Sequence, residues 1–178
     1  LQTADKFPHE LSGGQRQRVA IARAVATGAK FILADEPISM LDVSIRLGIL
    51  NLMMDMKEDG IGFLYITHDI ATARYFAERT GVMYVGHMVE WGESDSVTQT
   101  PQHPYTQLLI SAVPEIGRQR GTVNKDHTKN QIPLWTPASI GCPFALRCPK
   151  VKPVCREKMP DVTQVADDHY VRCFAFTE

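Results

Sequence analysis

The sequence predicts an α/β fold, in which helices flank a mainly parallel sheet and a small cysteine-containing extension follows. Two short apolar runs, at residues 31–34 and 63–67, have the length and composition of buried strands. Between them, apolar residues recur at helical spacing from about residue 43 to residue 59. A strand, a helix and a second strand in this order are typical of a parallel βαβ unit.

The first two predicted helices have clear start and stop signals. Ser12 is a favourable N-cap residue, and Gly28 follows the last apolar position of the first helix. Asp42 is the second N-cap residue, and Gly60 ends the helix that starts near residue 43. The expected apolar face of this second helix consists of Ile45, Ile49, Leu52, Met53 and Met56.

A third helix and a strand pair are predicted after the second parallel strand. The helix runs from about residue 70 to residue 78. The strand pair, 82–85 and 88–91, turns at Gly86 and His87. This pair ends the part of the chain in which strands and helices alternate.

The remaining sequence is rich in proline and polar residues. Prolines bracket a short predicted helix, 105–113, and residues 115–131 have the polar composition of a linker. All four cysteines follow. We therefore expect three segments, namely a core at 1–100, a helix and linker at 101–131 and a cysteine-containing extension at 132–178.

Composition narrows the functional classes. The 178 residues include 19 basic and 20 acidic side chains, for a net charge of −1, which gives no case for nucleic-acid binding. No apolar run approaches the ~18 residues that a transmembrane helix requires. Apolar residues make up 44% of the chain, as in a protein that buries a core.

The start of the first helix is a candidate anion site. Ser12, Gly13, Gly14 and Gln15 place two glycines where the free N–H groups and the helix dipole favour a phosphate. An ordinary capped helix start explains the same residues.

Acidic and histidine side chains follow the two predicted strands. Asp35 and Glu36 come after the first strand, and His68 comes after the second. Ligands of open α/β sheets bind at the carboxyl ends of the strands, so we expect these side chains at one edge. An aspartate there can hold Mg²⁺, and a glutamate can deprotonate a water. A solvated strand end and a structural histidine are the alternatives.

Taken together, these motifs resemble those of ABC-type ATPases, which have a P-loop NTPase-type fold. Residues 11–24 resemble the signature helix, 35–37 the Walker B motif, 39–42 the D-loop, and His68 the switch histidine. The resemblance extends over residues 1 to about 100. Four motifs in the family's order make a chance match very improbable.

Later segments resemble one branch of this family, the oligopeptide and dipeptide import ATPases. Residues 86–92 are similar to a hairpin found in many importers, and residues 101–109 are similar to a segment of the peptide-import group. The tail with its cysteines resembles the C-terminal extension of that group. The resemblance therefore implies a subunit that couples ATP hydrolysis to the transport of peptides across a membrane.

The family pattern implies contacts between two ATPase subunits. Ser12, Gly13, Gly14 and Gln15 would contact ATP bound to the partner subunit, and Asp42 would couple the two sites. Other implied partners are transmembrane permease subunits and, indirectly, an extracytoplasmic substrate-binding protein. The implied location is the cytoplasmic face of the cell membrane, where the subunit would be peripheral.

The same resemblance implies roles in hydrolysis. Asp35 would hold the Mg²⁺ of the ATP in its own subunit through a water molecule. Glu36 would act as the general base, and His68 would contact the γ-phosphate. ATP and Mg²⁺ are therefore the expected cofactors.

One motif of the family is missing from the sequence. No Gly-x-x-x-x-Gly-Lys-Ser/Thr segment, the loop that cradles the β- and γ-phosphates, occurs in the 178 residues. We therefore expect the chain to represent the C-terminal portion of a longer subunit and to be inactive as an ATPase by itself.

The four cysteines leave several chemistries open. Cys142, Cys148, Cys155 and Cys173 are separated by 5, 6 and 17 residues. Disulfides are disfavoured because such an ATPase works in the reducing cytosol. Zinc sites usually contain a closer pair, whereas iron–sulfur clusters tolerate wider spacing. Some peptide-import ATPases carry a 4Fe-4S cluster at matching positions, so the cluster is the first expectation, with Zn²⁺ and free thiols as alternatives.

Two other functions compete with peptide import. One is a soluble ABC ATPase with no role in transport, against which the segment 101–109 and the cysteine tail argue. The other is a non-catalytic fragment that keeps only the phosphate-binding helix start.

Overall fold

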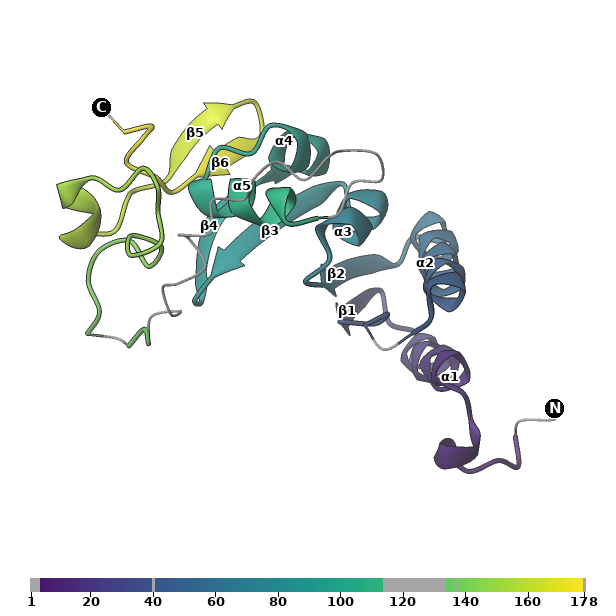
Figure 1. The fold of residues 1–178 in the computed structure, drawn as a ribbon. Coiled ribbons are helices and arrows are strands. Elements are labelled where there is room, and N and C mark those ends of the chain that lie inside the picture. Colours follow the sequence, from purple (N-terminus) through teal and green to yellow (C-terminus); the bar gives the residue numbers. More distant parts are fainter. Residues whose placement is uncertain (1–3, 40, 114–133, 137, 178) are drawn as a thin grey trace. The chain divides into compact units, whose positions relative to one another are not determined.

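The computed structural model describes residues 4–39, 41–113, 134–136 and 138–177 (Figure 1). Met40 of the expected D-loop and the predicted linker at 115–131 lie outside the described residues. The chain forms two compact units, one ending at Thr72 and the other beginning at Ala73. Each unit is considered by itself below.

The first unit alternates helices and parallel strands, as predicted. Its elements are η1 Pro8–Glu10, α1 Gly13–Ala26, β1 Phe31–Asp35, α2 Val43–Glu58, β2 Gly62–Ile66 and the start of α3 Ile70–Phe76.

Reciprocal capping starts α1. The Ser12 hydroxyl accepts the Gln15 N–H at 3.3 Å, and the Gln15 side-chain oxygen accepts the Ser12 N–H at 2.9 Å. This capping box satisfies two donors that the helix itself cannot satisfy. Gly28, with a φ of 72°, follows the end of the helix. The predicted start and stop signals of α1 are therefore confirmed.

The second helix packs on the first through a glycine (Figure 1). A Cβ added at Gly14 would lie 2.6 Å from Cγ2 of Ile45, so only glycine permits this approach. The predicted core positions Ile49, Met53 and Met56 are buried. Asp42 takes the predicted N-cap position, but its side chain makes no capping hydrogen bond.

The parallel strands β1 and β2 are confirmed, but their expected burial on both faces is not. Each residue from Phe31 to Asp35 pairs in register with one from Gly62 to Ile66. Side chains alternate between exposed and covered along both strands. Only one face of this pair is therefore covered, whereas parallel strands usually have both faces covered.

The second unit is built on an antiparallel sheet of order β3-β4-β6-β5. Its elements are β3 Arg79–Tyr84, β4 His87–Glu93, α4 Ser94–Gln99, α5 Pro104–Ser111, η3 Pro153–Arg156, β5 Thr163–Ala166 and β6 His169–Val171, together with the end of α3.

The predicted hairpin is confirmed, although its turn lies one residue earlier than expected. Val85 and Gly86 connect β3 to β4, and both have a positive φ, of 47° and 78°. Two such residues are typical of the type I′ turn, whose twist matches that of the flanking strands. The hairpin makes this sheet antiparallel, so the parallel part of the described fold is limited to β1 and β2.

The C-terminal segment joins the same sheet. Strand β6 pairs with β4 through Glu90↔Val171 and Trp91↔Tyr170, and β5 pairs with β6. Neither strand was predicted from the sequence. The α/β class is confirmed, while the limits of the three predicted segments stay a prediction.

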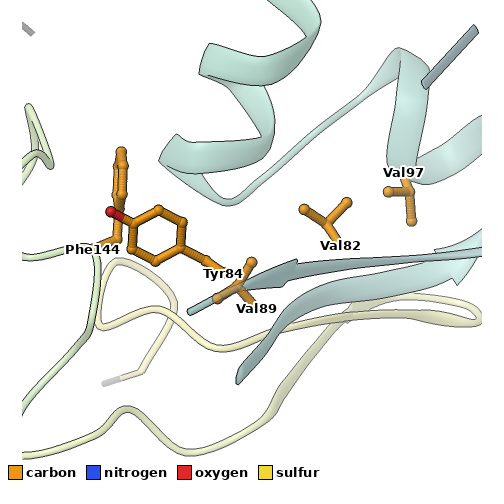
Figure 2. Packing of buried hydrophobic residues seen from close by; sticks show 5 residues of the cluster. All are labelled: Val82, Tyr84, Val89, Val97 and Phe144. Carbon is orange, nitrogen blue, oxygen red and sulfur yellow. The ribbon is translucent and has the colours of Figure 1, made fainter. Parts of the chain in front are cut away.

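The core of the second unit combines the hairpin with the cysteine-bearing segment. Figure 2 shows its buried side chains, which are Val82, Tyr84, Val89, Val97 and Phe144. The rings of Tyr84 and Phe144 meet edge to face, with centroids 5.3 Å apart. Phe144 therefore anchors the residues between Cys142 and Cys148 against β3.

The helices of the described part are all too short or too polar to cross a membrane.

Candidate active site

Glu36 occupies an unusual backbone conformation directly after β1. Its φ is 45°, a value that non-glycine residues rarely adopt. Its N–H donates to the Ile66 carbonyl at 2.9 Å, and its own carbonyl accepts both the Ser39 hydroxyl at 3.1 Å and the Ser39 N–H at 3.2 Å. The turn directs the chain away from β1 and leaves the carboxylate exposed.

His68, which follows β2, contacts this carboxylate. Its Nδ1 lies 3.0 Å from Oε1 of Glu36, within hydrogen-bond distance. The parallel register places the ends of both strands at one edge of the sheet, so the contact follows from the topology. The structure therefore brings together the two residues predicted as catalytic.

A small cleft of about 30 Å³ lies beside this pair and is lined by Glu36, Ile38, Ser39, Arg46, Thr67, His68 and Asp69. This space is enough for a water molecule with several polar partners. A carboxylate beside such a water has the arrangement that a general base needs.

Arg46 is a lining residue that the sequence analysis missed. It lies in the first turn of α2, where the helix dipole disfavours a cation. This unusual position is the sequence feature that could have marked Arg46 as a candidate site residue. Its Nε donates to the Leu41 carbonyl at 2.7 Å. Arg46 thus supplies positive charge to a cleft that otherwise carries the carboxylates of Glu36 and Asp69.

The other acidic candidates lie apart from the Glu36–His68 pair. Asp35 is exposed at the end of β1, opposite Ile66. Asp42 is exposed at the start of α2. In the part of the chain that the structure describes, no hydrogen bond or ion pair joins Asp35 or Asp42 to Glu36 or His68. Their predicted roles, in Mg²⁺ binding and in coupling, stay predictions.

The predicted phosphate-binding residues form a separate group at the start of α1. The side chains of Ser12 and Gln15 are engaged in the capping box with each other. The N–H groups of Gly13 and Gly14 are in the first turn, where a helix provides no acceptor for them. These two N–H groups are the donors that an anion would meet.

The four cysteines are free thiols, and charge on the other three would affect the pKa of Cys142. Burial raises the pKa of Cys142 to about 11, and negative charge on Cys155, Cys173 and Cys148 would raise it further. Burial likewise raises the pKa of Cys148 and of Cys173. Without a metal, these three thiols are therefore protonated at neutral pH.

Backbone contacts hold the cysteine segments in place. The Cys142 N–H donates to the Cys155 carbonyl at 2.7 Å, and the Lys152 N–H donates to the Cys155 sulfur at 3.3 Å. Gly141, with a φ of 84°, permits this approach, because a Cβ there would lie 2.7 Å from the same carbonyl.

The donor set suits zinc or an iron–sulfur cluster, but the arrangement does not. Four thiols are appropriate ligands for either. Among the residues described, however, no group of three or more cysteine, histidine or acidic side chains is placed so as to hold a metal ion. The predicted 4Fe-4S cluster and the Zn²⁺ alternative are therefore not confirmed.

Comparison with known proteins identifies two families. Residues 2–39 match the family described as ABC transporter. Residues 89–155 match the family described as oligopeptide/dipeptide transporter, C-terminal region. The matched segments include the helix start at Ser12 and the carboxylates Asp35 and Glu36 in the first case, and three of the four cysteines in the second.

Curated relatives agree with both matches. The chain is 42% identical to the oligopeptide transport ATP-binding protein AppF of Bacillus subtilis, over 98% of this chain and 54% of AppF. It is 39% identical to the dipeptide transport ATP-binding protein DppF of Haemophilus influenzae, over 96% of this chain and 52% of DppF. The chain thus spans about half the length of the curated relatives it matches.

Solved structures support the same fold. A nucleotide-free ATP-binding cassette from an ABC transporter aligns with a TM-score of 0.54 and 28% identity, over 62% of this chain and 44% of that one. The ADP conformation of the ATP-binding cassette MJ1267 aligns with a TM-score of 0.51 and 30% identity, over 58% and 41%.

Proposed function

We propose that this chain is a member of the oligopeptide and dipeptide group of ABC transporter ATP-binding proteins and that it serves in ATP-driven peptide import. The observation that carries the proposal is the Glu36–His68 contact beside a cleft with room for a water. The match of residues 89–155 favours transport over a soluble ABC ATPase without a transport role.

Glu36 is the general base of the proposed reaction. Its carboxylate accepts a proton from the attacking water, and the unusual φ fixes the direction from which it does so. His68 orients this carboxylate through the 3.0 Å contact, and contact with the γ-phosphate is its further proposed role. Mg²⁺, when bound, would neutralise charge on the phosphate oxygens, and Asp35 is the residue proposed to hold it.

The start of α1 is proposed to act on nucleotide bound by a second ATPase subunit. The N–H groups of Gly13 and Gly14, with the dipole of a helix of 14 residues, favour the negative charge of a phosphate there. Ser12 and Gln15 hold this turn in shape, and Asp42 is proposed to couple the two sites.

The proposed assembly comprises two ATPase subunits on transmembrane permease subunits, at the cytoplasmic face of the membrane. An extracytoplasmic substrate-binding protein would deliver the peptide. The support is the similarity of the chain to AppF and DppF, which are transport ATP-binding proteins.

A metal centre at the four cysteines is a proposal separate from the ATPase site. Its support is that the thiols lie close enough for charge on one to affect the pKa of another. The described side chains would have to reorient to share a zinc ion or a 4Fe-4S cluster.

Glu36→Gln tests the proposed function. The chain should be joined to the part of AppF that it does not match, which is proposed to supply the phosphate loop. We expect the variant to bind ATP as before and to lose about 100- to 10,000-fold in turnover, because an amide cannot accept the proton of the water. Phosphate release under saturating ATP measures turnover.

Glu58→Gln is the matched control, because Glu58 is an exposed glutamate at the end of α2, away from the cleft. It should leave turnover unchanged. Near-normal hydrolysis by Glu36→Gln would exclude Glu36 as the base.

A further inference from the structure

Strand β5 is the last strand of the second unit's sheet. The sheet order β3-β4-β6-β5 places β6 on one side of it (Figure 1). Within the residues that the structure describes, the backbone of Thr163–Ala166 makes no hydrogen bond outside its pairing with β6. The N–H and C=O groups that point away from β6 therefore form a free edge, to which another chain can bind.

A cavity of about 340 Å³ lies along this free edge, and its lining includes all four residues of β5. Successive side chains of a strand point to opposite faces, so a cavity over one face would meet only alternate residues. Contact with all four residues therefore places the cavity beside the strand, against its backbone. Its volume falls within the range of about 300–1,000 Å³ that is typical of ligand sites.

The rest of the lining combines a buried polar group with an aromatic ring. His169 is only 2% exposed, and its Nε2 contacts the buried carboxylate of Glu90 at 2.8 Å. Nδ1 is therefore the ring nitrogen that remains for a ligand. Phe176 provides an apolar wall, and the described lining contains neither lysine nor arginine. This surface suits a ligand that has both hydrogen-bonding groups and apolar side chains.

Exposed carboxylates flank β5 at both ends. Asp161 lies two residues before the strand, and Asp167 follows it directly. In the described part of the chain neither forms an ion pair, whereas the neighbouring Asp168 pairs with Arg79 at 2.7 Å. A ligand with positive charge near each end would be attracted here. A second copy of β5 would instead be repelled, because pairing of the two strands would bring like charges together.

We propose that the cavity beside β5 binds a short, extended, free peptide with basic side chains. The peptide adds a strand to the free edge, so main-chain hydrogen bonds supply affinity, and its lysine or arginine side chains meet Asp161 and Asp167. The four residues of β5 extend about 13 Å, which matches a peptide of four or five residues. The cavity belongs to the second unit, whereas Glu36 and His68 belong to the first, so this inference goes beyond the proposed function.

Binding of a synthetic peptide to the 178-residue chain tests the proposal. The peptide has lysine at both ends, with valine, threonine and valine between them, and both termini are blocked. Titration calorimetry at low salt measures its affinity, and we expect a Kd below about 1 mM. Hydrogen exchange followed by NMR reports on the strand itself. At saturating peptide, exchange of the β5 amides that point away from β6 should slow more than tenfold.

Two N-methylated forms of the peptide test whether its backbone makes the contact. One is methylated at the second and fourth backbone nitrogens, and the other at the third. A strand directs alternate N–H groups to its neighbour, so only one of the two forms should lose hydrogen bonds to β5. We expect that form to bind at least tenfold more weakly and the other to stay within about threefold. Equal effects of the two methylations would overturn strand addition.

Asp161→Asn and Asp167→Asn test the contribution of charge with little change in shape. Each should weaken binding of the lysine peptide about two- to fivefold, as expected for one exposed ion pair. A peptide with glutamate in place of both lysines should bind at least tenfold more weakly to the unaltered chain. Asp59→Asn is the matched control, because Asp59 is an exposed aspartate at the end of α2 in the first unit, and it should leave the affinity unchanged.

Three results would overturn the proposal. One is the absence of binding at about 1 mM lysine peptide. Another is a dimer in light scattering whose β5 amides are protected without peptide, since a second copy would then occupy the edge. The third is loss of binding when the chain is joined to the unmatched part of AppF, since that part would then cover β5. All binding is measured without ATP, so its outcome is independent of the test of hydrolysis.

Discussion

Glu36 shows how much of the candidate site depends on one residue's conformation. A positive φ at a non-glycine residue costs of order 1–3 kcal/mol, and such residues cluster at functional sites. Here the backbone bond to Ile66 and the contact with His68 hold the residue in place. The residue types were predictable, because acidic and histidine side chains follow two strands. The backbone conformation was not, since it depends on bonds between residues about 30 positions apart.

The cysteines allow a prediction that distinguishes a metal centre from free thiols. The pKa of Cys142 is about 11 instead of 9, so its thiolate fraction at pH 8 is about a hundredfold lower than that of an ordinary cysteine. In metal-free protein, iodoacetamide should therefore modify Cys142 about tenfold more slowly, because the higher nucleophilicity of a more basic thiolate offsets part of this loss, and the rate should rise with pH up to about 11.

Protein purified without oxygen provides the other half of this test. If a 4Fe-4S cluster is present, the protein is brown, contains iron and sulfide, and loses its colour in Cys148→Ser. Stoichiometric zinc without iron would instead identify a zinc site. Four thiols that alkylate in the native, anaerobic protein, with no metal present, would contradict both.

At the scale of elements, a buried glutamate connects three segments of the second unit. Glu90 on β4 accepts the N–H groups of Gln102 and His103 at 2.7 and 2.9 Å and contacts Nε2 of His169 on β6 at 2.8 Å. Burial lowers the pKa of His103 to about 4, so its neutral ring can accept the Tyr105 N–H at 3.1 Å. Glu90 thus fixes the start of α5 and the position of β6.

Glu90→Gln should destabilise this unit by about 3 kcal/mol. The amide replaces one acceptor oxygen of the carboxylate with an N–H₂ group, which would then face the N–H donors that this oxygen satisfies. Unfolding in urea, followed by the fluorescence of Trp91 and Trp135, measures the change. Glu93→Gln is the control on the same strand, where the side chain is exposed, and should change stability by less than about 0.5 kcal/mol. Equal stability of the two variants would show that the Glu90 contacts contribute nothing.

Elements with local signals could be predicted, and elements that depend on distant partners could not. Ser12 and Gly28 act within their own helix, and Gly86 acts within its own hairpin, so sequence was sufficient for both. The strands at 163–166 and 169–171 are short. The second pairs with β4, some 80 residues earlier, and the first pairs only with the second. The contacts of Glu90 join residues that are 12, 13 and 79 positions apart, so they could not be predicted from the sequence either.

At the scale of the whole molecule, the described residues provide only part of the proposed nucleotide site. The carboxylates of Glu36 and Asp69 lie at the cleft, with Arg46 as the cation among the lining side chains. ATP is itself highly negative, so this charge arrangement does not attract it. The backbone N–H cradle and lysine of a phosphate loop, which would reverse that balance, do not occur in the sequence.

The 178-residue chain should therefore bind ATP no more tightly than about 1 mM, which corresponds to only about 4 kcal/mol. Titration calorimetry with Mg²⁺ and ATP measures the affinity, and phosphate release should stay at background. The control is the same chain joined to the unmatched part of AppF, which should bind ATP at least a hundredfold more tightly if that part supplies the proposed phosphate loop. A micromolar Kd for the chain alone would mean that Gly13, Gly14 and Arg46 hold the phosphates without a loop, and the assignment of an incomplete site would be wrong.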